Sequence, residues 1–102
     1  MRKIVTICGS LRFFDKMQEV AELLELQNGW IVFAPVPHTL GSELTSQQKQ
    51  LLGDIHKAKI DLSDAIFVVN AGGYIGEATR QEIEYATQKG KEIFYLEGIL
   101  II

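Results

Sequence analysis

Short apolar runs alternate with amphipathic stretches along the whole chain. Four runs are rich in β-branched or aromatic residues, and the first is continuous rather than alternating, as is typical of strands covered on both faces. The pattern predicts strands over residues 4–7, 30–33, 64–69 and 91–96.

Between the predicted strands, three stretches carry apolar side chains at helical spacing. In the first, Met17, Val20, Ala21 and Leu24 fall at i, i+3, i+4 and i+7, and Asn28-Gly29 predicts a left-handed end. The second helix is predicted over residues 45–62, with Leu51, Leu52, Ile55 and Leu62 along one side, and the third over 77–88, ended by Lys89-Gly90.

This alternation predicts one α/β domain over residues 1–102. Short strand–helix–strand connections favour a parallel sheet with right-handed crossovers. We expect a three-layer, flavodoxin-like (Rossmann-like) sheet of order 2-1-3-4 with helices on both faces. In that order a crevice opens at the carboxyl ends of the first and third strands, beside the loops 9–12 and 70–76.

Glu82 is the most informative single residue. On an ideal helix with Ala78 at zero, Glu82 falls at about 40°, inside the apolar stripe, while the other charges of this helix fall on the opposite side. A carboxylate facing a core is costly unless it is paired or used. The position therefore predicts either a functional carboxylate at the crevice or a structural ion pair or hydrogen bond.

The two loops at the crevice supply the candidate binding residues. Glycines before the third helix allow close approach to backbone amides that favour an anion, although a plain turn has the same composition. Ser10 could bind a ligand or cap the first helix, and Arg12 could bind a phosphate or face solvent. The candidate substrate-binding residues are Cys8, Gly9, Ser10, Arg12, Asn70, Gly73, Gly76 and Glu77.

The composition of the chain limits the kinds of ligand that it is expected to bind and the compartment in which it is expected to occur. A net charge of −3 gives no electrostatic footprint for a nucleic acid polymer or an anionic membrane. The one cysteine, Cys8, excludes an intrachain disulfide, and a buried thiol is the simplest interpretation of it. His38 and His56 lack metal-ligand spacing, so surface or packing roles are expected, with no metal and no cofactor. The absence of a signal-peptide core or a long apolar segment predicts a cytoplasmic protein.

Three segments resemble the nucleoside 2-deoxyribosyltransferase family, which includes the 2′-deoxynucleoside 5′-phosphate N-hydrolases. They are ICGSLR at 7–12, DAIFVV at 64–69 and QEIEYA at 81–86. The resemblance implies that Glu82 is a nucleophile that attacks C1′ of a deoxyribose and forms a covalent glycosyl-enzyme. It also implies that Gly9, Ser10 and Arg12 lie near the sugar and the 5′-phosphate of a nucleoside or nucleotide.

The chain departs from the family pattern at three positions. The family has a tyrosine near the end of the first strand, an aspartate before the third strand and a serine or aspartate before the nucleophile. Here these positions hold the segment 6–8 (TIC), His56 and Gly76. The departures favour an alternative, a non-catalytic nucleotide-binding module, and a small interaction domain with Glu82 in a salt bridge is a third interpretation. The apolar tail 99–102 predicts a homo-oligomer, most simply a dimer.

Overall fold

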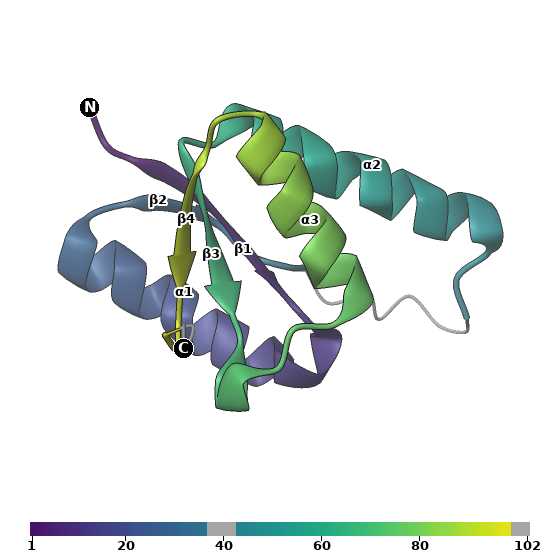
Figure 1. The fold of residues 1–102 in the computed structure, drawn as a ribbon, viewed down its shortest axis with the longest axis horizontal. Helices are drawn as coiled ribbons and strands as arrows, with labels where there is room; N and C mark the ends of the chain where they lie inside the picture. Colours follow the sequence, from purple (N-terminus) through teal and green to yellow (C-terminus); the bar gives the residue numbers. More distant parts are fainter. Residues whose placement is uncertain (37–42, 99–102) are drawn as a thin grey trace.

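The predicted strands form one parallel sheet in the order β2-β1-β3-β4 (Figure 1). The computed structural model describes residues 1–36 and 43–98. The strands are β1 (Ile4–Gly9), β2 (Ile31–Phe33), β3 (Ala65–Val69) and β4 (Glu92–Tyr95). Every adjacent pair is parallel, with Val5 opposite both Val32 and Ala65. The predicted flavodoxin-like strand order is confirmed.

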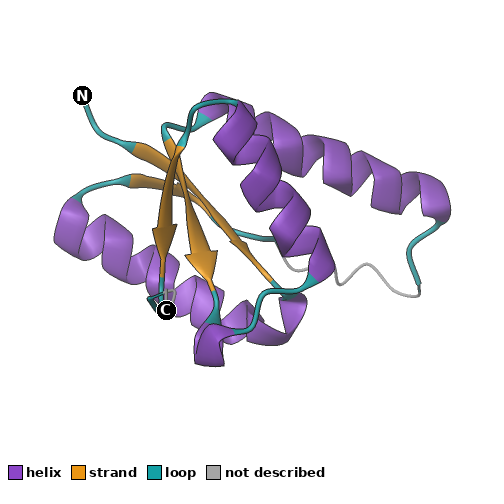
Figure 2. Ribbon diagram, in the orientation of Figure 1, coloured by secondary structure: helices purple, strands orange, loops and turns teal. Residues whose placement is uncertain are grey.

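Helices cover both faces of the sheet and make three layers (Figure 2). They are α1 (Phe14–Asn28), α2 (Ser46–Leu62) and α3 (Glu77–Gln88). Helix α1 packs against one face, and α2 and α3 pack side by side against the other. Short 3₁₀ turns, η1 (Leu11–Phe13) and η2 (Ala71–Gly73), follow β1 and β3.

Two apolar clusters separate the layers, because successive side chains of a strand point to opposite faces. On the α1 side, Ile7 of β1 and Val69 of β3 pack against Met17. On the other side, Cys8 packs in the cluster that contains Ile60 of α2. The alternation along β1 therefore points the Cys8 side chain toward the layer formed by α2 and α3.

The helix ends follow the sequence signals. Gly29 ends α1 with φ of 68°, a left-handed conformation that a side chain would strain. Thr45 begins α2 with a capping box, in which its hydroxyl accepts from the Gln48 amide and the Gln48 side chain accepts from the Thr45 amide.

Most of the apolar side predicted for α2 faces away from the sheet. Leu51, Ile55 and Leu62 are exposed, whereas Leu52 is half-buried and Ile60, which was not in the predicted set, is fully buried. At 100° per residue, Leu51, Ile55 and Leu62 share one side of α2, and Ile60 lies on nearly the opposite side, which faces the sheet.

None of the helices in the described ranges is long and apolar enough to cross a membrane. The tail 99–102, on which the expectation of a dimer rests, lies outside the described residues, as does His38.

Candidate active site

A cavity of about 520 Å³ lies beyond the carboxyl ends of β1 and β3. This volume is within the roughly 300–1,000 Å³ typical of small-molecule sites. One side is formed by residues that end or follow β1, among them Gly9 and Ser10. The other side is formed by Tyr74 and the start of α3, and His56 and Glu82 also line the cavity. The crevice expected from the strand order therefore exists.

Glu82 faces inward, as its position in the apolar stripe predicts. Its side chain is 27% exposed and lines the cavity. The opposite side of α3 carries an exposed charge network, in which Arg80 bonds to Glu77 at 2.6 Å and to Glu84 at 3.0 Å. Two glutamates of this helix are thus satisfied at the surface, and the third is held in the interior.

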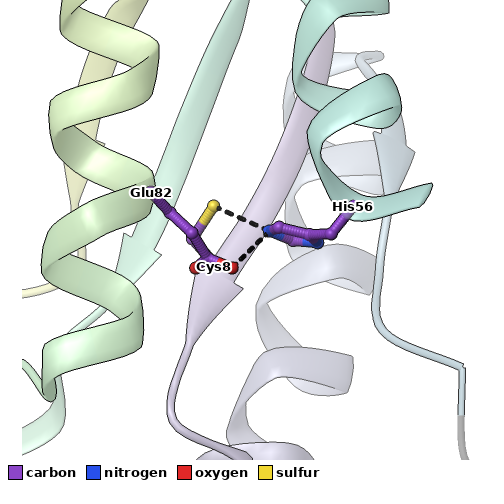
Figure 3. A group of neighbouring side chains, drawn as sticks. All are labelled: Cys8, His56 and Glu82. Carbon is purple, nitrogen blue, oxygen red and sulfur yellow. Dashed lines mark hydrogen bonds and ion pairs between the residues drawn. The ribbon is translucent and has the colours of Figure 1, made fainter. Parts of the chain in front are cut away.

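His56 of α2 meets Glu82 across the gap between the two helices (Figure 3). The Nε2 atom of His56 lies 3.1 Å from Oε2 of Glu82 and 3.4 Å from Sγ of Cys8. The Cys8 thiol is 1% exposed, whereas the His56 side chain is 23% exposed and reaches the cavity. Three titratable side chains, one each from β1, α2 and α3, therefore lie in contact with one another.

Burial controls the protonation of all three groups. It raises the pKa of Glu82 to about 7, although a hydrogen bond from the Cys8 thiol lowers it in part. Burial, reinforced by the nearby Glu82 carboxylate, raises the pKa of Cys8 well above its usual value. Burial and the positive charge of Lys59 lower the pKa of His56. At neutral pH the thiol and imidazole are neutral, and the carboxyl group is partly protonated.

Several residues proposed from sequence meet at the cavity: Gly9, Ser10, Gly76, Glu77 and Glu82. Gly9 is also required by packing, because a Cβ there would lie 3.0 Å from the Val69 carbonyl oxygen. The Ser10 hydroxyl accepts from the Arg12 amide at 3.3 Å and caps the 3₁₀ turn η1. At Gly76 a Cβ would lie 3.2 Å from the Tyr74 hydroxyl, so glycine leaves room for this ring beside the cavity.

Other proposed residues lie behind the cavity or beside it. Cys8 is behind Glu82, in contact with His56. Arg12 stacks on the Tyr74 ring, with its guanidinium carbon 4.1 Å from the ring centroid. Asn70 is 2% exposed, and its side chain bonds the backbone of Glu97 in both directions, which fixes the segment after β4.

The glycine loop already holds an anionic group of this chain. The amide of Gly72 donates to the carboxylate of Glu97, which is the kind of contact expected for a bound anion. Gly72 and Gly73 adopt φ of 63° and 81°, so the loop also needs glycine for its turn. These observations account for the loop as a turn, and neither Gly72 nor Gly73 lines the cavity.

His56 is the main site residue that the spacing of sequence motifs did not assign. It lies one helical turn before Ile60, which is fully buried, so the two residues share the inner face of α2. Because the more apolar side of α2 is the exposed one, the inward position of Ile60 and His56 is visible in the structure and not in the sequence pattern. Tyr74 and Thr79 also line the cavity, and both lie near the predicted start of the third helix.

Comparisons with known proteins add no relative. A scan against family models, a search of curated proteins and a search of solved structures each gave no match.

Proposed function

We propose that this chain cleaves the N-glycosidic bond of a deoxynucleoside or its 5′-monophosphate, or transfers the deoxyribosyl group, with Glu82 as the nucleophile. The observation that supports this most is the placement of one half-buried carboxyl group in the wall of a 520 Å³ cavity, in contact with a histidine. The family resemblance of the surrounding motifs selects the same residue.

The proposed reaction has two displacements. An oxygen of Glu82 forms a bond to C1′ of the sugar while the C1′–N bond breaks, and the base leaves with the electron pair and takes a proton from solvent. Water then attacks C1′, the bond from C1′ to the Glu82 oxygen breaks, and the extra proton of the water passes to solvent; in transfer, a second base takes the place of the water. The partly apolar surroundings of Glu82 exclude water from a positively charged, oxocarbenium-like transition state.

His56 would act as the positioning residue for this nucleophile. Its pKa is lowered by burial, so the imidazole is neutral, and its Nε2 atom lies 3.1 Å from Oε2 of Glu82, in contact with the nucleophile. The attacking form of Glu82 is the carboxylate. Because its pKa is raised to about 7, the rate should rise as the pH passes through that value.

The rest of the cavity offers contacts of the expected kind. Ser10 and the backbone near Gly9 would face one side of the sugar, and the amides that begin α3 at Gly76 and Glu77 would face the other. Arg12 is held on the ring of Tyr74, which lines the cavity, and would supply a cation for a 5′-phosphate.

The direct experiment compares substitution of Glu82 with the same substitution at an exposed glutamate of the same helix. The protein, treated with a chelator, is incubated with deoxynucleosides and with their 5′-monophosphates, and free base is measured by chromatography. Glu82→Gln should abolish release of the base, whereas Glu84→Gln, on the exposed side of the same helix, should retain it. Equal release by wild type and Glu82→Gln would exclude this residue as the nucleophile.

A non-catalytic nucleotide-binding module is the second candidate. The contact of Glu82 with His56 and its hydrogen bond from Cys8 favour it, since a carboxyl group held by two neighbours has fewer lone pairs for attack. This candidate predicts saturable binding of a deoxynucleotide by calorimetry, without release of base, and weakened by Arg12→Ala.

A further inference from the structure

Three different metal-binding atoms converge at one point of this structure. The Sγ of Cys8, the Nε2 of His56 and a carboxylate oxygen of Glu82 all lie within 4.8 Å of one another. Donor atoms bound at about 2.0–2.3 Å to a tetrahedral zinc ion lie roughly 3.3–3.6 Å apart. The separations of His56 Nε2 from Cys8 Sγ, 3.4 Å, and from Glu82 Oε2, 3.1 Å, are close to that spacing, and Cys8 Sγ lies within 4.8 Å of the Glu82 oxygen.

The three donors come from three different elements of the fold. Cys8 belongs to β1 at the centre of the sheet, His56 to α2 and Glu82 to α3 (Figure 3). Each donor is carried by regular secondary structure rather than by a loop, so little backbone order must be gained when an ion binds. A thiolate with an imidazole and a single carboxylate suits zinc, whereas magnesium and calcium prefer oxygen ligands alone.

We propose that Cys8, His56 and Glu82 form a three-residue site for a zinc ion, with its fourth coordination position open to the cavity. Two of the ligands, His56 and Glu82, line that cavity, and their side chains are 23% and 27% exposed, which gives an ion a path to the site. Three protein ligands and one open position are the arrangement of catalytic zinc sites, whereas structural sites close all four.

Zinc binding must overcome the burial that keeps Cys8 and Glu82 protonated, because zinc binds their deprotonated forms. Burial makes a negative charge on Cys8 or Glu82 unfavourable, and it keeps His56 neutral, which is the form that binds metal. A divalent cation reverses the penalty on both anionic ligands. On binding, the thiol proton and any proton on the carboxyl group pass to solvent, and the sulfur and oxygen lone pairs form the bonds to zinc.

Zinc binding and nucleophilic attack would use the same carboxylate and therefore exclude each other. The zinc site does not depend on the proposed glycosidic reaction, because it rests only on the convergence of the three donors. The chelated protein tests the reaction, and the metal-loaded protein tests the site, so failure of one leaves the other standing.

Cobalt(II) is the probe, because a cobalt–thiolate bond gives a charge-transfer band in the near ultraviolet. Chelator-stripped, reduced protein is titrated with cobalt and then with zinc. We expect one cobalt per chain with the thiolate band, displacement by equimolar zinc, and a rise in the melting temperature when zinc is bound. Cys8→Ser should lose the band, and His56→Gln and Glu82→Gln should each weaken binding at least about tenfold.

Glu84→Gln is the matched control and should bind cobalt like the wild type, because Glu84 lies on the solvent side of α3. Absence of a thiolate band in the wild type would overturn the proposal. The proposal would also be overturned if both His56→Gln and Glu82→Gln showed the thiolate band and bound cobalt as tightly as the wild type. The cysteine would then bind cobalt without the other two ligands.

Discussion

Replacing Glu82 by glutamine should stabilise this protein at pH 8 and have little effect at pH 5. Burial raises the pKa of this carboxyl group from 4.5 to about 7, so the folded state holds its proton more tightly than the unfolded state does. Between these two values the folded state binds more protons, and its stability therefore falls as the pH rises. Above pH 7 the full cost of a buried charge is present, and the neutral amide of glutamine removes it.

The size of the effect follows from the shift. One pKa unit corresponds to about 1.36 kcal/mol, so a rise from 4.5 to about 7 costs about 3 kcal/mol at pH 8. At pH 5 the folded carboxyl group is protonated, and the remaining cost is below about 1 kcal/mol. For a domain of this size, 1 kcal/mol changes the melting temperature by about 4–8 °C. We therefore expect a gain of about 12–24 °C in the melting temperature at pH 8.

Urea denaturation and thermal melting at both pH values, with chelator present, measure this difference. His56 and Cys8 face the same carboxyl group from α2 and β1, and Lys59 of α2 lowers the pKa of His56. These groups are present in the wild type and in Glu82→Gln. The quantity to compare is therefore the change in stability caused by the substitution at pH 8 and the same change at pH 5. Glu84→Gln serves as the control and should change stability by less than about 0.5 kcal/mol at either pH. A loss of stability at pH 8, or an equal gain at both pH values, would refute the reasoning.

Three further substitutions test the packing that positions the site. Ile60→Ala should lower the free energy of unfolding by about 2–5 kcal/mol in urea titrations, because Ile60 is fully buried. Leu62→Ala, at an exposed position, should change it by less than about 0.5 kcal/mol. Equal losses of stability in the two variants would contradict the packing of α2. Asn70→Ala should cost about 1–3 kcal/mol and increase amide exchange after β4, because both bonds to Glu97 are lost. Thr45→Ala should cost about 1 kcal/mol in thermal melts, and Thr45→Ser should retain the cap.

The strand order could be predicted from sequence because the apolar runs and their separations allow few other arrangements. Continuous runs such as 64–69 identify strands that are covered on both faces, and short crossovers fix the rest. The inner face of α2 was harder to predict. Its exposed side chains Leu51, Ile55 and Leu62 outnumber the single fully buried Ile60, so hydrophobicity alone points to the wrong side of this helix.

The same difficulty explains why Glu82 could be placed from sequence and His56 could not. In α3 the charged residues Glu77, Arg80 and Glu84 gather on one side, so the sequence predicts that the opposite side faces inward. Glu82 is then recognisable as a carboxylate on the inner side. For α2, the side that faces inward is set by how the helix packs on the sheet and on α3. The sequence of α2 alone does not reveal this packing. A buried carboxyl group nevertheless requires polar partners, and here they come from β1 and from α2, on the sheet face that α3 covers. His56 meets this requirement from one turn before the buried Ile60, but α2 holds many other polar residues, so the packing of α2 on the sheet and not its sequence selects His56.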